Sequence, residues 1–437
     1  MNFRSPARVG SIGLVAILSS CFLGTPAIAQ QTSDPQTMEQ LLKRLSELEA
    51  RLKEVEARNP PAPTGAPAAA PAVAPGEPVS AAVSAADQAE ANAILQQAAS
   101  GNATGHTFGK MSIVGFSDFT FGRPLEENLP PGGVAGSSNS FTMGDLSLFI
   151  TSQLTPKVSF YSEALFTADF TNSWGAEVDR LVLQYKANDY FQVGVGRFNT
   201  ALGYYTNGIN RAKIFQTATD RPFMYTDEDA GGLLPVHSVG VTMTGKLPSG
   251  GIGLHWVAEL SNGTASLSAT AEPVQSLYDE NNRKAYNLGL FIKPERLDGF
   301  QAGVSVYRDK LEPAGLARVD ENIVGAYAVY VRPTFEFMNE TAIISYSPTN
   351  GTPTYKTGMG YSQISRRFGR TRPYLRLEYQ SADRYDLNFP NFGTRKSFEA
   401  GVRRDLAEFF AIKAQIGRTY WNHAWAYDPQ VQLAFTF

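Results

Sequence analysis

Charged side chains recur at every second position of many short, otherwise apolar segments in the last three quarters of the sequence. Such alternation places successive side chains on opposite faces of a β-strand. A strongly selective channel would carry a ring of one charge sign, so a mixture suits a passage with weak selectivity. If these strands close into a barrel, one face of each strand lines its interior. On the face that we predict to point into that interior, both signs occur: Arg180, Lys356, Arg376, Arg403 and Lys413, with Glu163, Glu259, Glu336, Glu340, Glu378 and Glu399.

The sequence holds none of the short motifs that carry common catalytic chemistry. It has no Gly-x-Ser-x-Gly elbow, no His-Glu-x-x-His pair and no phosphate-binding loop with a lysine. We therefore predict no enzymatic activity, no cofactor and no metal centre. Calcium prefers carboxylate ligands such as Asp227, Glu228 and Asp229, but a solvated or pore-facing acidic loop is the simpler interpretation. The net charge of -3 gives no argument for a nucleic-acid partner.

Sixteen segments of alternating polarity lie between His106 and Phe437 and predict sixteen strands. In the stretch YLRLEYQ, apolar and charged or amide side chains alternate without a break from Leu375 to Gln380. The segments centre on Gly115, Leu148, Ala164, Leu183, Val195, Val241, Trp256, Leu290, Val304, Ala328, Thr341, Gly360, Leu377, Ala400, Ala414 and Leu433.

The links between these segments alternate in length. The longer links cover residues 122–139, 199–236, 261–283, 309–321 and 382–395, and the shorter ones cover 155–157, 188–189, 247–250 and 332–334. Short periplasmic turns and long outer loops are typical of outer-membrane barrels. A sheet in lipid must also close, because unpaired backbone groups are costly there. We predict an all-β membrane protein: a closed antiparallel transmembrane β-barrel of about 16 strands over residues 106–437.

Residues 1–29 have the features of a secretory signal peptide. Arg4 and Arg8 precede an apolar run, and Ala27-Ile28-Ala29 forms a small-x-small cleavage site. A lipoprotein-type site that would leave a lipidated Cys21 is the alternative. Since Cys21 is the only cysteine, cleavage after Ala29 leaves a chain without thiols and without disulfides.

Two further segments precede the predicted barrel. Residues 30–58 carry an apolar 3-4 repeat, which is the seam of a coiled coil. We predict oligomerisation through this seam, and a lone amphipathic helix is the alternative. Residues 59–105 are rich in Pro and Ala and are predicted to form a linker. The leucines of the seam are Leu41, Leu45, Leu48 and Leu52.

The last seven residues, VQLAFTF, alternate strictly, with Val431, Leu433, Phe435 and Phe437 on one face. This stretch resembles the C-terminal signature of bacterial outer-membrane barrels, and the resemblance covers residues 106–437. It implies that these four residues are recognised by the barrel-assembly machinery. It also implies an outer-membrane location with membrane lipid as a partner, and an N-terminal segment in the periplasm.

A second resemblance lies in GRFNTALGYY, from Gly196 to Tyr205. This stretch is similar to the strand-to-loop motif of phosphate-selective porins of the O and P type. Asn199 stands where that motif has a basic residue, and Ala201 where it has proline, so phosphate selectivity does not follow. The resemblance implies a homotrimer, and a coiled coil before a porin barrel is a familiar arrangement. The motif residues kept are Gly196, Arg197, Phe198, Leu202 and Gly203.

The longest predicted loop, Asn199–Val236, contains apolar residues that a solvated loop would not need, such as Tyr204 and Phe223. Loops of this length are usually functional, and we predict that this one folds into the lumen as a constriction loop. Its acidic end would then set up a transverse field against the basic strands. A loop over the mouth of the barrel is the alternative. The charged constriction residues are Arg211, Lys213, Arg221, Asp227, Glu228 and Asp229.

These patterns together predict an outer-membrane porin. Small hydrophilic solutes or ions, anions among them, would diffuse passively through it. The alternative comes from a different class: a structural barrel that tethers the envelope through its coiled coil. Channel conductance separates the two. The predicted pore-lining residues are Arg180, Glu259, Arg376, Glu378, Glu399, Arg403 and Lys413.

Overall fold

One antiparallel sheet of eighteen strands contains nearly all the regular structure in the described part of the chain. The computed structural model describes residues 106–108, 111–122, 139–168, 174–209, 212–226, 232–263, 278–279, 281–312, 317–351, 353–382, 393–421 and 423–437. Two strands are short: β1 (His106–Phe108) and β3 (Ser140–Met143). The other sixteen are β2 (Met111–Gly122), β4 (Leu146–Thr155), β5 (Val158–Ala168), β6 (Trp174–Asn188), β7 (Phe191–Asn199), β8 (His237–Lys246), β9 (Leu254–Ser261), β10 (Ala285–Ile292), β11 (Phe300–Leu311), β12 (Val319–Arg332), β13 (Phe335–Pro348), β14 (Tyr355–Arg366), β15 (Thr371–Ser381), β16 (Thr394–Ala407), β17 (Phe410–Trp421) and β18 (Ala424–Thr436).

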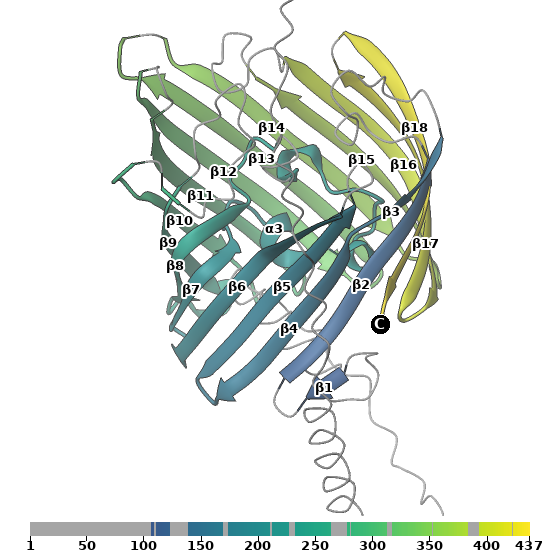
Figure 1. The fold of residues 1–437 in the computed structure, drawn as a ribbon, viewed down its shortest axis with the longest axis horizontal. Helices are drawn as coiled ribbons and strands as arrows, with labels where there is room; N and C mark the ends of the chain where they lie inside the picture. Colours follow the sequence, from purple (N-terminus) through teal and green to yellow (C-terminus); the bar gives the residue numbers. More distant parts are fainter. Residues whose placement is uncertain are drawn as a thin grey trace, which may run out of the picture. The chain divides into compact units, whose positions relative to one another are not determined.

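The sheet closes on itself (Figure 1). The last strand, β18, pairs with β2 from Gln430↔Gly122 to Thr436↔Phe116. The strands β3 and β4 pair with the two halves of β2 and together fill one position in the wall. Just after β18, Phe437 exchanges two backbone hydrogen bonds of 2.8 and 2.9 Å with Gly115. Closure removes the free edges of the sheet, and the predicted closed barrel of sixteen strands is confirmed.

Alternation along each strand separates an outer face from an inner face. In β15, Leu375 and Leu377 are exposed on the outside, whereas Arg376 and Glu378 are buried on the inside. Other strands repeat this pattern, so the outer surface is largely apolar and polar groups gather inside, as the period of two requires. Exposed apolar side chains of the wall include Leu181, Leu183, Val195, Leu288, Leu290, Val304, Val324, Ile343 and Ile416.

The two ends of the barrel differ in the length of their links. At one end, which we call the short-turn end, the links are residues 156–157, 189–190, 247–253, 293–299, 333–334, 367–370 and 408–409. At the other, the long-loop end, the link 200–236 is the longest. The predicted sorting of links therefore holds for most of the chain, and the two-residue link 422–423 at the long-loop end is an exception.

Two sequence-based predictions about strand ends are wrong. The link predicted at 309–321 covers only 312–318, because β11 and β12 continue with paired polar residues beyond the apolar part of the wall. Lys356, predicted to face inward, lies on the outer face of β14. Its outward neighbours Gly358 and Gly360 carry no side chain, whereas Met359 faces inward. At this site the charged side chain faces outward and the apolar side chain faces inward, which is the reverse of the usual arrangement.

Helical structure is sparse in the described residues. The link between β7 and β8 contains α3 (Tyr205–Gly208) and two short 3-10 helices, η2 (Lys213–Phe215) and η3 (Phe223–Tyr225). A further 3-10 turn, η5 (Gly250–Ile252), lies in the link before β9. In the described ranges, no helix has both the length and the apolar character needed to span a bilayer.

Candidate functional site

The described residues of the link between β7 and β8 lie inside the barrel, where α3 is visible between the walls (Figure 1). We call these residues, 200–209, 212–226 and 232–236, the inner loop. Several of its buried apolar side chains, among them Leu202, Met224 and Leu234, form one cluster with inward side chains of β12 to β14 such as Ile323 and Met338. Tyr204 and Phe223, which mark this link in the sequence, are thus packed against other protein groups rather than solvated.

The stretch from Gly196 to Tyr205, which the sequence analysis singled out, forms the end of β7 and the start of the inner loop. Gly196 has φ of +138°, a conformation that favours glycine. Asn199 donates from Nδ2 to the carbonyl of Thr206 at 2.6 Å, so it holds α3 against the end of β7. At Gly203, a Cβ would overlap the Tyr225 hydroxyl and the Glu340 carboxylate, so glycine lets these two groups approach the loop.

Glu340 on β13 binds the inner loop at its beginning and near its middle. It accepts hydrogen bonds from the backbone N–H groups of Tyr204 (2.6 Å) and Tyr205 (3.0 Å). It also accepts from the hydroxyls of Tyr225 and Tyr361, both at 2.6 Å. Burial raises the pKa of Tyr225, which keeps this hydroxyl protonated as a donor. Four donors on one carboxylate fix the loop to the wall.

Two other wall carboxylates accept from backbone N–H groups of the inner loop. Glu259 on β9 accepts from Ala201 at 3.1 and 3.2 Å, and its Oε2 also accepts from the Asn287 side chain at 2.8 Å. Glu378 on β15 accepts from the N–H of Phe223. Buried carboxylates need such donors, because an unpaired ionised group is costly away from water.

Three wall cations donate to carbonyl groups of the inner loop. Arg376 Nη1 donates to Asp220 O at 2.6 Å. Arg403 Nη1 donates to the carbonyls of Ile214 and Gln216, the second at 2.9 Å. Lys413 Nζ donates to the carbonyls of Lys213 (2.6 Å) and Ala218 (2.8 Å). The segment 213–220 therefore runs along β15, β16 and β17.

The predicted pore-lining residues fall into two separate groups. Arg376 lies between Glu378 (2.8 Å) and Glu399 (2.5 Å), with side chains that are almost fully buried. Together with Glu259, Arg403 and Lys413, this group contacts the inner loop. Arg180 belongs elsewhere, because it pairs with Glu163 at 2.7 Å between β6 and β5.

Among the predicted constriction residues, Lys213 and Arg221 are described. The Lys213 and Asp220 side chains lie 3.8 Å apart and are 24% and 28% exposed, so they form a partly accessible pair of opposite charges in the described part of the loop. Arg221 donates to the carbonyl of Tyr225 at 3.1 Å. Arg211, Asp227, Glu228 and Asp229 lie outside the described residues, as do the predicted coiled-coil leucines Leu41, Leu45, Leu48 and Leu52.

The sequence identifies Glu340 only as an inward position and does not predict its role at the loop. It also does not predict a role for Tyr361 or for Gln415, which accepts from the Tyr374 hydroxyl at 2.5 Å and from the N–H of Thr219 at 3.4 Å. No local signal could have identified these residues, since their partners in the inner loop are more than a hundred positions away. Within the described ranges, no group of three or more His, Cys, Asp or Glu residues is placed to hold a metal ion.

Lys293 lies in the link after β10 at the short-turn end, and we predict that its buried ammonium makes the stability of the barrel depend on pH. Its Nζ is buried without a hydrogen-bond partner among the described residues and lies 6.0 Å from the Phe291 ring centre. Burial, with a smaller effect of Lys246, lowers the pKa of Lys293 from 10.5 to about 7. The unfolded chain therefore binds more protons between these values, and stability rises with pH from about 7 towards 10.

The Lys293→Met variant is expected to be more stable than the wild type at pH 7, by about 1–3 kcal/mol. Its stability should also change less between pH 7 and 10. Denaturant midpoints of the folded barrel, measured across this range, check both statements. Lys157→Met, which removes an exposed ammonium from another link at the short-turn end, is the matched control. Parallel pH profiles for Lys293→Met and the wild type would contradict the assignment.

A closed antiparallel barrel of sixteen strands, with an apolar outside, a polar inside and a loop folded inward, defines the class of porin-type β-barrels.

No family model matches the chain, and no curated protein matches it. Solved structures do match. The outer membrane channel DcaP of Acinetobacter baumannii aligns over 75% of this chain and 97% of its own, with a TM-score of 0.53 and 10% identity. An anion-selective porin from Comamonas acidovorans aligns over 75% and 99%, with a TM-score of 0.50 and 12% identity. At these identities the similarity establishes the fold.

Proposed function

We propose that this protein is an outer-membrane porin through which small hydrophilic solutes or ions diffuse passively. The proposal rests on the position of the inner loop, which wall groups of both charge signs hold inside a sixteen-stranded barrel. Carboxylates hold its N–H groups, and cations hold its carbonyls. A loop fixed in this way narrows the lumen, and we propose that water and small solutes pass beside it.

We propose weak ion selectivity. The wall groups at the inner loop carry both signs, and Arg376 lies between two carboxylates. Asn199, where the phosphate-selective motif has a basic residue, is used to hold α3. An anion preference would therefore have to come from the balance of the accessible loop charges rather than from a dedicated phosphate site.

The outer membrane is the proposed location. The exposed apolar face of the strands supports it, since such a face is suited to lipid. Partners proposed with it are membrane lipid, the barrel-assembly machinery at Val431, Leu433, Phe435 and Phe437, and two further copies in a homotrimer. The heptads of residues 30–58 support an oligomer on the periplasmic side.

Single-channel recording of the purified protein in a planar bilayer under a salt gradient tests the proposal. A porin gives discrete, long-lived conductance steps, and a trimer closes in three of them. A barrel that serves only as a structural tether gives no steps at any voltage, although the folded protein is present in the membrane. That second result would overturn the proposed function.

The accessible pair in the inner loop gives a prediction about ion preference. Lys213→Gln should move the reversal potential towards cation preference, and Asp220→Asn should move it towards anion preference, since each removes one charge from a low-dielectric passage. The double variant should return close to the wild-type value. An unchanged reversal potential in both single variants would place this pair away from the ion path.

A further inference from the structure

The outer wall carries a groove that the proposed channel does not use. It lies over β13 to β16, at the long-loop half of the strands, and has a volume of about 720 Å³. Its floor is made of the small outward residues Gly358, Gly360 and Ser362 of β14. A Cβ added at Gly358 would have no atom within 4 Å, so the space above β14 is open. Its walls are the outward side chains of Ile343, Leu377 and Phe398.

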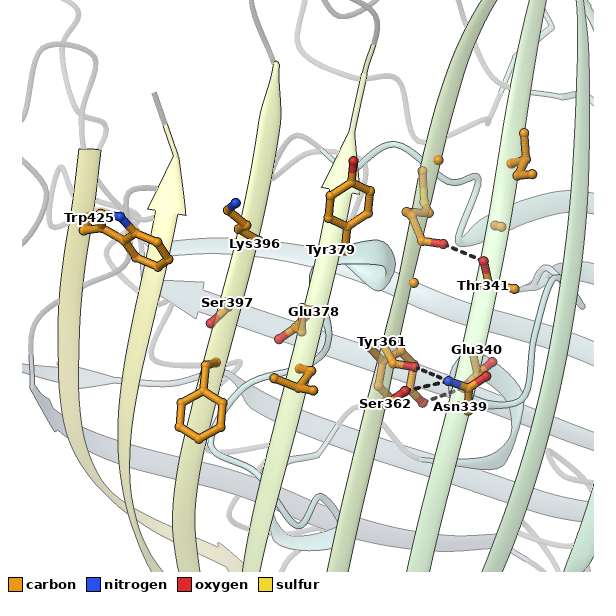
Figure 2. A pocket seen from close by; sticks show the side chains of 17 residues that line it. Asn339, Glu340, Thr341, Tyr361, Ser362, Glu378, Tyr379, Lys396, Ser397 and Trp425 are labelled. Atoms are coloured by element: carbon orange, nitrogen blue, oxygen red, sulfur yellow. Dashed lines mark hydrogen bonds between the residues drawn. The ribbon is translucent and has the colours of Figure 1, made fainter. Parts of the chain in front are cut away.

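The polar groups on the floor of this groove already have partners. Asn339 donates from Nδ2 to the Ser362 hydroxyl at 2.6 Å, and Thr341 donates from Oγ1 to the carbonyl of Met359 at 3.0 Å (Figure 2). What the groove offers to a ligand is therefore apolar surface between two ridges of large side chains. A lipid acyl chain fits this chemistry.

Cations and aromatic rings lie at the long-loop end of the same face. Strand register places Tyr379, Lys396, Tyr420 and Trp425 in one outward row, and Leu377, Phe398, Arg418 and Tyr427 in the next. Figure 2 shows Tyr379, Lys396 and Trp425 at one level, on β15, β16 and β18. Lys396 and Arg418 are thus diagonal neighbours on adjacent strands, about 7–8 Å apart in the backbone. One anionic group can reach both.

These two cations rest on aromatic rings instead of carboxylates. Lys396 Nζ lies 5.1 Å from the Tyr420 ring centre, and Arg418 Cζ lies 4.4 Å from that of Trp425. Among the described residues, neither cation forms an ion pair, whereas Lys310, also exposed at the long-loop end on β11, pairs with Asp320 at 3.4 Å. The charges of Lys396 and Arg418 are therefore available to an external anion, and aromatic rings at this level are typical of a membrane interface.

We propose that this face binds a phosphorylated lipid of the outer leaflet. Its phosphate lies on Lys396 and Arg418, and one acyl chain lies in the groove over β14. Arginine and lysine form charge-assisted hydrogen bonds with phosphate oxygens, and cations next to a membrane attract anionic headgroups. This inference rests on the proposed location in the outer membrane but does not depend on conduction through the lumen.

Binding to the full-length folded protein in detergent tests this inference, with diphosphoryl lipid A as the probe and phosphatidylcholine, a zwitterion without net charge, as the reference. Native mass spectrometry counts the retained lipids over a titration. The wild type should retain lipid A in preference to phosphatidylcholine. Lys396→Gln/Arg418→Gln should weaken that retention by about tenfold or more, since charged hydrogen bonds are lost. Gly358→Leu, which fills the groove and leaves both cations in place, should weaken it as well.

Lys310→Gln is the matched control, because it removes an outward cation at the same end that already has a carboxylate partner. Its lipid retention should equal that of the wild type. Equal retention in the double variant and the wild type would overturn the inference, as would an equal loss in Lys310→Gln, which would reveal unspecific attraction. A changed oligomeric state of the double variant with unchanged lipid retention would also overturn it and make this face a contact between copies. Loss of lipid retention with normal conductance separates this site from the proposed channel.

Discussion

Replacing Arg376 by Met is expected to lower the free energy of unfolding of the barrel by about 3–5 kcal/mol. The side chain is 1% exposed and lies between the carboxylates of Glu378 and Glu399, on its own strand and on β16. Its removal leaves two carboxylates close together in a buried place, with no cation between them. The same change also removes the donor to Asp220 O, so the inner loop loses one of its supports. Denaturant unfolding of the protein in lipid vesicles measures the loss.

The variant that neutralises the whole group is the control for this prediction. Arg376→Met combined with Glu378→Gln and Glu399→Gln removes the repulsion, and a glutamine at 378 still has an oxygen for the Phe223 N–H. Its stability should return most of the way to the wild type. A single Arg376→Met variant as stable as the wild type would show that these carboxylates are protonated or hydrated, and that the arginine does not hold the group together.

Glu340→Ala is expected to release the inner loop from the wall. The change removes the acceptor of four donors, from Tyr204, Tyr205, Tyr225 and Tyr361. Each buried donor left without a partner costs about 1–3 kcal/mol. We therefore expect a loss of about 3 kcal/mol or more in stability, together with a larger and noisier single-channel conductance. Planar-bilayer recording and vesicle unfolding of the same preparation measure the two effects.

Two tyrosine variants separate the role of the loop from the role of the wall. Tyr225→Phe removes one donor on the loop side of Glu340, and Tyr361→Phe removes one donor on the wall side, both at 2.6 Å. Each should cost about 1 kcal/mol of stability. Conductance noise should rise in Tyr225→Phe and stay unchanged in Tyr361→Phe. Equal noise in the two variants would mean that Glu340 stabilises the barrel without controlling the loop.

The strands could be predicted because the information for them is local. Each of the sixteen predicted centres, from Gly115 to Leu433, lies in one of the sixteen long strands. A strand with lipid on one side and polar surroundings on the other must alternate, so its own residues report it. The signal fails where the side chains are small. Gly358 and Gly360 have no side chains that could mark the outer face of β14 as apolar. The alternation therefore predicts the wrong side for Lys356.

The sequence by itself determined the number of strands, the end of the barrel at which the long links lie, and the presence of a long link too apolar for water. Only the tertiary structure decided which groups meet that link. Glu340 reaches Tyr204 across 136 positions and Lys413 reaches Lys213 across 200. It also decided that Lys396 and Arg418 share one outward surface with a groove over β14. The physical reason is that alternation fixes the face of each side chain within its own strand. The neighbours of that side chain depend on register and closure around the whole ring, which no single segment encodes.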